Sequence, residues 1–153
     1  SGAGAFDDES SAQYKAFRWI HSDGIDMEAD NFIQRYVLAV FYFSTNGDRW
    51  TICFRGAGNC EAPYLGSNHE CEWHGNGCSD GKVVDQLRFG TSEGNNITGT
   101  LPNEISELEA LTHIILRNNK IGGSICDCIG RLTNVELIDF RNNLFTGRIP
   151  TSI

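Results

Sequence analysis

The stretch Asn95-Asn96-Ile97-Thr98-Gly99-Thr100-Leu101-Pro102 recurs twice further along the chain, as Asn119-Lys120-Ile121-Gly122-Gly123-Ser124-Ile125-Cys126 and as Asn143-Leu144-Phe145-Thr146-Gly147-Arg148-Ile149-Pro150. The glycines Gly99, Gly123 and Gly147 are evenly spaced along the chain. Apolar positions keep the same spacing, as Ile114 and Ile138 illustrate. A fixed period of about 20–29 residues predicts a solenoid, in which each repeat packs its apolar face against the next.

Each repeat is expected to contribute one short strand, here residues 114–116 and 138–140, to a parallel sheet. Alternate strand residues point into the core. Asn95, Asn119 and Asn143 lie where the chain bends away from the strand, and their amides can satisfy backbone groups that would otherwise be buried and unpaired. We therefore expect an asparagine ladder through the repeats.

Side chains between the inward strand positions form the solvent-facing, concave face of the sheet, which we name the strand face. Arg117 and Arg141 occupy the same position of successive repeats, so we expect them on neighbouring strands, roughly 5 Å apart. Exposed Ile115 and Leu137 beside them favour a contact surface, although an ordinary solvated face is an equal alternative. The candidate ligand-binding residues are Gln86, Arg88, His113, Ile115, Arg117, Leu137, Asp139 and Arg141.

The chain has 153 residues and a formal net charge of −8. This acidity argues against nucleic acid and against anionic lipid as partners, because both are bound through Lys and Arg. No apolar run reaches the roughly 18–20 residues that span a bilayer. The chain starts without Met, so we expect any signal peptide or membrane anchor to lie outside it.

Three regions are expected. Residues 1–9 are small and acidic, which predicts a flexible N-terminus. Residues 10–82 hold two helical patterns, one capped by Ser10 or Ser11 and ending at His21, the other from about Glu28 to Phe43, and then a cysteine-rich loop. Residues 83–153 contain about 2.5–3 repeats. The second helix is expected to bury one broad apolar face, formed by Phe32, Ile33, Tyr36, Val37, Val40 and Phe41.

The repeat, read as Leu-x-x-Leu-x-Leu-x-x-Asn-x-Leu-x-Gly-x-Ile-Pro, resembles the plant-type, 24-residue extracellular class of leucine-rich repeats. Asn46-Gly47-Asp48-Arg49-Trp50 and Cys71-Glu72-Trp73-His74-Gly75-Asn76-Gly77-Cys78 are similar to the N-terminal cap motifs of that class, with Asn76 replacing the usual Val. Residues 13–20 and 34–42 resemble its diatom, or stramenopile, subset.

The resemblance implies an α/β solenoid: a short right-handed coil with a parallel sheet on its concave face, preceded by a helical, disulfide-stapled cap. It implies a non-enzymatic, extracellular or secretory-pathway module that binds a protein or a glycan, with no cofactor. One alternative is a structural subunit whose open C-terminal edge is covered by further repeats or by a partner chain. Another is the ectodomain of a membrane receptor.

Six cysteines fall in local pairs, which favours disulfides and a secretory route. Cys71 and Cys78 could hold a metal with His69 or His74, but the cap motif favours a disulfide, so no metal site is expected. A bridge is also the expected state of Cys53 with Cys60. Three states are open for Cys126 and Cys128: a disulfide to each other, thiol–disulfide exchange with a partner, or two free thiols.

The four histidines, at positions 21, 69, 74 and 113, form no recognisable catalytic arrangement. The acidic run from Asp23 to Asp30 lacks the order of a calcium-binding EF-hand loop, so we interpret it as a solvated helix start. Asn96-Ile97-Thr98 is an N-glycosylation sequon, and we expect Asn96 to face solvent and to carry a glycan.

Three departures from the repeat pattern are expected to matter. Residues 90–94 add three residues between the first strand and its ladder asparagine, which predicts a bulge at that rim. Cys126 stands where the other repeats have Pro102 and Pro150. The sequence stops at Ile153 within a repeat, so we expect the last repeat to be covered by further repeats or by a partner.

Overall fold

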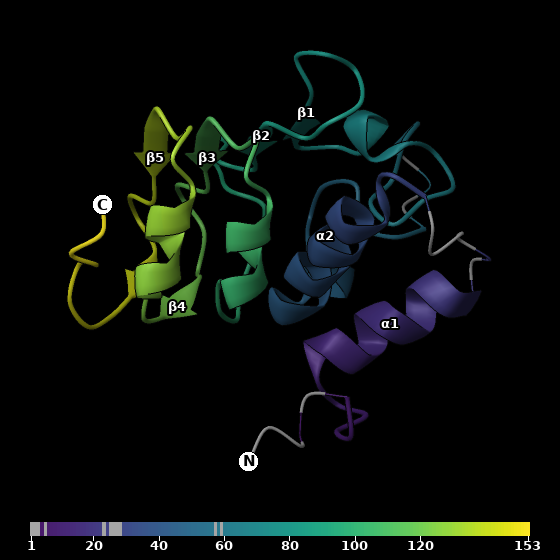
Figure 1. Ribbon diagram of the computed structural model, residues 1–153, viewed down its shortest axis with the longest axis horizontal. Coiled ribbons are helices and arrows are strands. Elements are labelled where there is room, and N and C mark those ends of the chain that lie inside the picture. The colour runs from purple at the N-terminus through teal and green to yellow at the C-terminus, as the bar shows by residue number, and fades with distance from the viewer. Residues whose placement is uncertain (1–3, 5, 23, 25–28, 57, 59) are drawn as a thin grey trace.

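A computed structural model describes the chain except residues 1–3, 5, 23, 25–28, 57 and 59. Two helices, α1 (Ala12–Ser22) and α2 (Phe32–Ser44), precede the repeats and pack against each other. Figure 1 shows the strands of the repeats stacked side by side, with α1 and α2 at the other end of the molecule. The short 3-10 helices are η1 (Gly47–Arg49), η2 (Glu70–Glu72), η3 (Asn103–Glu107) and η4 (Asp127–Arg131).

The main sheet has the strand order β1-β2-β3-β5, made of β1 (Asn76–Gly77), β2 (Gln86–Arg88), β3 (His113–Ile115) and β5 (Leu137–Asp139). The repeat strands β2, β3 and β5 are parallel, as expected, whereas β1 from the cysteine loop runs antiparallel to β2. Because β1 pairs with β2, the cap adds a strand to the sheet, which the sequence did not lead us to expect.

The strands begin one residue earlier than predicted, at His113 and Leu137. The inward alternation is unaffected, because Ile114 and Leu116 are fully buried. His113 pairs with Leu137, which occupies the same position of the next repeat. Gln86 pairs with His113, and the stretch of chain between these two residues is longer than that between His113 and Leu137. The extra residues between β2 and Asn95 account for this longer step.

A second, smaller sheet forms on the return path of the repeats, where β4 (Gly122–Gly123) pairs with β6 (Leu144–Phe145). Thr100 extends it through a parallel bridge to Gly122. This sheet was not predicted from the sequence. The sheet is formed by the Asn-x-x-x-Gly segments from which the repeats were recognised. These segments therefore turn the chain and also pair with one another.

The asparagines at 95, 119 and 143 connect each repeat to the one before it. The Asn119 Oδ1 accepts hydrogen bonds from the backbone N–H groups of Asn95 (2.9 Å) and Ile97 (3.1 Å). The Asn143 Oδ1 accepts a hydrogen bond from the backbone N–H of Ile121 (3.1 Å). Asn95 Oδ1 accepts from Ile52 N–H at 2.6 Å, so the first ladder position is bonded to the cap.

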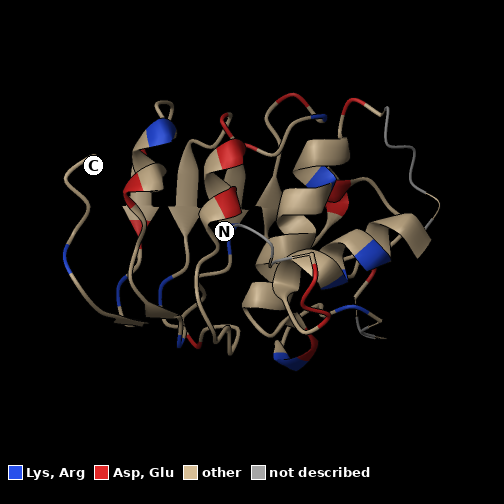
Figure 2. Cartoon of the chain, turned by 60° about the horizontal axis from the view of Figure 1, so that its bottom comes forward, with Lys and Arg blue, Asp and Glu red and all other residues tan. Residues whose placement is uncertain are grey.

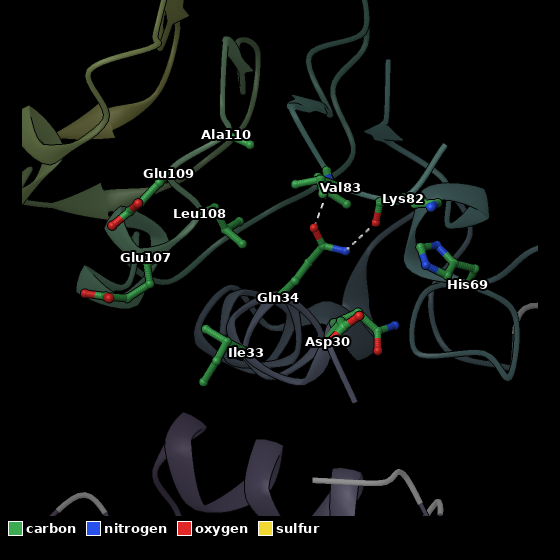
Figure 3. Close-up of a pocket in the computed structure, with 12 residues that line it drawn as sticks. Asp30, Ile33, Gln34, His69, Lys82, Val83, Glu107, Leu108, Glu109 and Ala110 are labelled. Carbon is green, nitrogen blue, oxygen red and sulfur yellow. Dashed lines mark hydrogen bonds between the residues drawn. The ribbon is translucent and has the colours of Figure 1, made fainter. Parts of the chain in front are cut away.

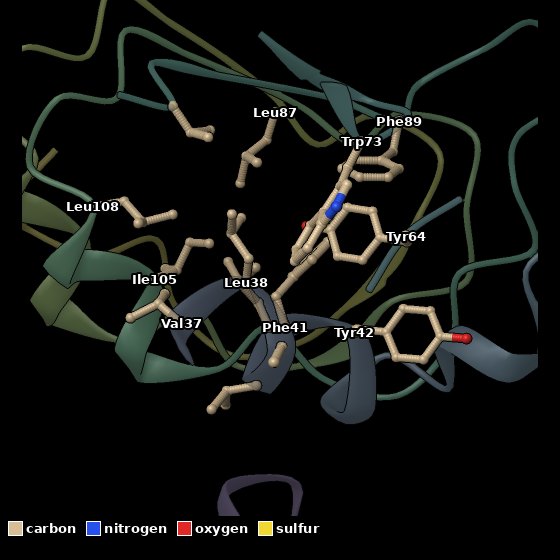
Figure 4. Close-up of a cluster of buried hydrophobic side chains, with 14 of the residues drawn as sticks. Val37, Leu38, Phe41, Tyr42, Tyr64, Trp73, Leu87, Phe89, Ile105 and Leu108 are labelled. Atoms are coloured by element: carbon tan, nitrogen blue, oxygen red, sulfur yellow. The ribbon is translucent and has the colours of Figure 1, made fainter. Parts of the chain in front are cut away.

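An aromatic cluster joins the cap to the first repeat (Figure 4). The Trp50 ring lies 5.0 Å from both Tyr42 and Phe89 and 5.1 Å from Tyr64, measured between centroids. Phe89 directly follows β2. A Cβ at Gly47 would overlap the Tyr42 ring, which explains why glycine occupies this position of the Asn-Gly-Asp motif. The cap and the repeats therefore share one core.

Helix α2 differs from the prediction at its start and on one side. It begins at Phe32 rather than near residue 28, and residues 25–28 lie outside the described residues. Ile33, expected in the core, is 58% exposed, whereas Leu38 and Tyr42 are fully buried. The reason is that α2 is covered on two sides, by α1 and by η3, so its buried face is rotated toward Leu38.

The described part of the N-terminal segment contacts the first helix, and its flexibility stays a prediction. The Phe6 ring packs edge-on against Phe17 at 6.0 Å between centroids, and Asp8 accepts hydrogen bonds from Ser10. Ser11 caps α1, since its hydroxyl accepts from the Tyr14 N–H at 3.0 Å. Part of residues 1–9 is therefore anchored to the first helix.

A buried ion pair lies inside the cap. Arg35 is 7% exposed and Glu70 fully buried, and their side chains form a 2.5 Å ion pair. The guanidinium also donates to the backbone carbonyls of Gly66 and Asn68 and lies 4.9 Å from the Trp73 ring centroid. This pair therefore ties α2 to the cysteine-rich loop.

The structure contains three disulfides, Cys53–Cys60, Cys71–Cys78 and Cys126–Cys128, which are the local pairs expected from the sequence. The first two lie within the cysteine-rich loop that packs against α2. The third lies at the start of η4, in the position that proline takes in the neighbouring repeats.

The strand register predicts a large loss of stability at one residue and a small loss at its neighbour. Leu116→Ala should lower the free energy of unfolding by about 2–5 kcal/mol, because it removes a fully buried side chain. Arg117→Ala should lower it by less than about 1 kcal/mol, because that side chain is 42% exposed and Asp139 keeps its two shorter hydrogen bonds to Arg141. Urea denaturation of the two variants checks this, and the reverse ranking would show that the register is wrong.

The buried ion pair predicts a contrast between two arginines. Arg35→Met should destabilise the chain by about 3–5 kcal/mol, because it leaves the buried Glu70 carboxylate without its cation. Arg148→Met is the matched control, since the Arg148–Asp127 pair is exposed on both sides and should contribute less than about 1 kcal/mol. Equal midpoints in thermal denaturation of both variants would contradict this assignment.

Candidate binding surface

The strand face carries the residues predicted for it, arranged in rows across the sheet. One row contains Gln86, His113 and Leu137, and the next contains Arg88, Ile115 and Asp139. Leu137 is 43% exposed, and Ile115 is half-buried. The rows place apolar and cationic side chains beside one another, as expected.

Arg117 and Arg141 do not form an unsupported pair of cations, because Asp139 lies between them. Arg141 donates from Nε and from its terminal nitrogen to the two Asp139 oxygens, each at 2.9 Å. Arg117 donates to one of these oxygens at 3.4 Å. Asp139 was predicted to point outward on the strand face as a candidate ligand-binding residue. It is only 8% exposed, since the two guanidinium groups cover its carboxylate.

The carboxyl of Asp139 is strongly acidic in this setting. The Arg141 side chain, which donates hydrogen bonds to the carboxylate, lowers the pKa of Asp139 to about 2. Burial opposes this effect, and the charge of Arg117 adds to it. The same interaction raises the pKa of Arg141. Asp139 and Arg141 therefore both stay charged across the physiological pH range.

The strand face has a net positive charge within an acidic protein. Arg88, Arg117 and Arg141 bring three positive charges against the single carboxylate of Asp139, while the whole chain has a net charge of −8. Figure 2 shows the basic residues of the chain in blue and the acidic residues in red. Arg88 is oriented by Gln86, whose Oε1 accepts from Arg88 Nε at 2.6 Å. Such a face attracts a ligand that carries a carboxylate or another anionic group.

The predicted bulge borders this cluster. Thr91 and Ser92 use their carbonyls to accept hydrogen bonds from the Asn118 side chain. Gly94 has a φ of +75°, and a Cβ there would collide with the Asn118 carbonyl, so the loop can lie this close only with glycine. The extra residues therefore pack against the second repeat.

Asn96 is only partly exposed, in contrast to the solvent-facing position predicted for it. Its amide nitrogen donates to the Arg49 carbonyl at 3.0 Å, and its Oδ1 accepts from Lys120 Nζ at 3.0 Å. The reason is that η1 of the cap reaches the turn after the ladder asparagine. Glycosylation of Asn96 stays a prediction.

The structure contains a cleft that sequence reasoning missed, and we name it the junction cleft (Figure 3). Its volume is about 700 Å³. It lies where the start of α2, the segment before β2 and the turn after η3 meet. The lining residues are Asp30, Asn31, Ile33, Gln34, His69, Lys82, Val83, Val84, Glu107, Leu108, Glu109 and Ala110. They come from segments far apart in the sequence, so no local motif marked the cleft.

No group of three or more His, Cys, Asp or Glu side chains suited to a metal ion occurs among the described residues. Cys71 and Cys78, the metal-ligand alternative, are joined in a disulfide. Their neighbour His69 accepts a hydrogen bond at Nδ1 from the Cys71 N–H. The acidic run at 23–30 lies largely outside the described residues.

Comparison with known proteins supports a leucine-rich-repeat fold. Residues 110–132 match the Leucine Rich Repeat family model. Receptor-like protein 32 of Arabidopsis thaliana is 37% identical over 68 residues, which are 44% of this chain and 8% of that protein. The chain therefore contains a leucine-rich repeat and has a plant receptor-like protein among its relatives.

Solved plant ectodomains have a similar fold. The ectodomain of the receptor kinase SOBIR1 from Arabidopsis thaliana aligns with a TM-score of 0.54 and 22% identity, over 74% of this chain and 55% of that one. The ectodomain of GASSHO1/SCHENGEN3, solved in complex with CASPARIAN STRIP INTEGRITY FACTOR 2, aligns at 0.52 and 25%, over 57% and 11%. The ectodomain of HAESA, solved with an IDA peptide hormone ligand, aligns at 0.50 and 26%, over 57% and 14%.

This chain thus spans only a small part of the receptor-like protein and about half of the SOBIR1 ectodomain. Neither α1 nor α2, nor any other helix in the described part of the chain, has the length and apolar character required to cross a membrane.

The arginine pair predicts the titration of Asp139. Its carboxyl carbon, followed by NMR, should titrate near pH 2, and Arg141→Gln should raise that pKa toward the usual value of about 3.9. Since the folded pKa is the lower one, the stabilisation is complete above about pH 5 and is lost as the pH falls toward 2. An unchanged titration in Arg141→Gln would mean that Asp139 is not held by this side chain.

Proposed function

We propose that this chain is a non-enzymatic recognition module, extracellular or in the secretory pathway, that binds a protein ligand through the strand face. The fold is that of plant receptor ectodomains, and two of those ectodomains were solved with a bound protein or peptide ligand. The chain's local disulfides fit an oxidising compartment. We also propose that the repeats form a right-handed solenoid of the 24-residue plant type. The chain would then be a member of the diatom subset of that class.

The observation that carries the proposal is the cluster of Arg117, Asp139 and Arg141. Asp139 fixes both guanidinium groups, so their orientation is set before a ligand arrives, which lowers the entropic cost of binding. The Arg117 and Arg141 side chains remain 42% and 73% exposed. They therefore keep donors for a carboxylate of the ligand, beside the aliphatic surface of Ile115 and Leu137.

A second candidate function is structural assembly. In the last repeat Leu144 is 62% and Ile149 80% exposed, and within the described part of the chain β5 pairs on one side only, with β3. Exposed apolar side chains beside an unpaired strand edge favour association with another chain or with further repeats. A receptor ectodomain is a third alternative, which the receptor relatives favour.

The test uses peptides selected from a random display library on the disulfide-bonded chain. We expect selected peptides to carry acidic residues and to bind at least tenfold more weakly to the double variant Arg117→Gln/Arg141→Gln, because charge-assisted hydrogen bonds contribute about 1.5–3 kcal/mol each. Arg148→Gln, an exposed arginine outside the strand face, is the matched control and should bind normally.

Two results would count against the strand face as the protein site. One is full affinity of the selected peptides for the double variant. The other is an equal loss in Arg148→Gln, which would mean that only the overall charge matters. A parallel array of acidic oligosaccharides separates the classes, since binding there without any peptide binding would replace the protein ligand by a glycan.

A further inference from the structure

The junction cleft exposes apolar side chains that the core does not use. Ile33 is 58% exposed and Val83 is 43% exposed. Both line the junction cleft, from different segments. Single exposed apolar residues are ordinary, whereas two that face one hollow mark an interaction surface.

The walls of the cleft are held in place by hydrogen bonds. Gln34 accepts from the Val84 N–H at 2.7 Å and donates to the Lys82 carbonyl at 3.3 Å, as the dashed lines of Figure 3 show. It also donates to Glu70, the buried partner of Arg35. The segment before β2 is thus fixed to α2, so the cleft is formed before any ligand binds.

The charges around the cleft are mainly negative. Asp30, Glu107 and Glu109 line it, against the single cation of Lys82. Of the three carboxylates, only Glu107 has an ion-pair partner within the described ranges, the exposed Arg131 at 3.1 Å. The partly exposed Ala110 and the buried Leu108 line the cleft beside Glu109. This combination repels anions and favours a ligand that is both cationic and aliphatic.

The cleft is distinct from the strand face. Val83 and Val84 precede β2, and Leu108 and Ala110 precede β3, so the cleft lies at the N-terminal ends of the strands. Arg117 and Arg141 follow the C-terminal ends of β3 and β5. The two surfaces also carry opposite charges, and a ligand suited to one is repelled by the other.

We propose that the junction cleft is a second binding site, which takes a segment of a partner protein with an aliphatic side chain flanked by arginine or lysine. The aliphatic group would pack between Ile33 and Val83, and the flanking cations would pair with Asp30 and Glu109. The proposal does not depend on the ligand of the strand face. The chain would then hold two protein segments of opposite charge at once.

The test uses capped pentapeptides of the pattern Arg-x-Leu-x-Arg, with x Gly or Ser, because residues two apart in an extended peptide point to the same side, so that Leu and both Arg face the cleft. Matched panels replace Arg by Glu, or Leu by Ser. Each is titrated into the isotope-labelled, disulfide-bonded chain, and NMR follows the methyl groups of Ile33 and Val83. We expect saturable shifts there with the Leu/Arg panel alone.

Variants of the cleft should weaken this binding selectively. Glu109→Lys should reduce the affinity at least tenfold and Ile33→Ser at least fivefold. Glu93→Lys makes the same charge change, and Leu144→Ser the same kind of apolar loss, at exposed positions outside the cleft, so both should bind normally. Thermal denaturation confirms that each variant is folded, and peptides selected on the strand face should bind Glu109→Lys and Ile33→Ser unchanged.

Three results would overturn the proposal. The first is the absence of shifts at Ile33 and Val83 with every panel up to millimolar concentration. The second is equal binding of the Glu-containing panel, which would remove the role of the carboxylates. The third is a shift of these methyl groups with protein concentration alone, which would make a second copy of this chain the occupant.

Discussion

The fold depends on the pairing of buried backbone groups between one repeat and the next. A repeat of this length cannot satisfy the amides at its bend by itself, and a buried unpaired N–H costs about 1–3 kcal/mol. Asn119 and Asn143 solve this by accepting from the backbone of the preceding repeat. At Asn95 the preceding segment is the cap, and the carboxamide accepts from Ile52 instead. The cap thus supplies the donors and the apolar cover that a preceding repeat would otherwise provide.

The period and the ladder could be predicted because they are local properties of the sequence. Ile114, Leu116 and Asn119 recur with fixed spacing, and a short strand places them without ambiguity. The disulfides followed from proximity in the same way. Long-range partners could not be predicted: Arg35 and Glu70 are 35 residues apart and look like surface charges until α2 packs against the cysteine-rich loop.

The candidate site was anticipated in part. The strand-face residues lie in the predicted rows, but an aspartate between two arginines of different strands cannot be recognised as buried from its own segment. Ile33 shows the same limit from the opposite side, since helical spacing cannot distinguish a core residue from one at the rim of a cleft. Which side of α2 is buried depends on the packing of η3 against it. The position of η3 is set in turn by the fold of the first repeat.

The shared aromatic core has a consequence for the order of folding. Strand partners such as Ile114 and Ile138 lie a single repeat apart, so each new repeat closes a short loop. By contrast, the bond from Ile52 to Asn95 spans 43 residues and the one from Gln13 to Glu104 spans 91. Loop closure costs more entropy as the loop lengthens, and contacts between distant residues slow folding. Helix α1 can pack against α2 as soon as both are synthesised, whereas the hydrogen bond to Glu104 must wait for the first repeat, so the shared core is completed only after that repeat has left the ribosome.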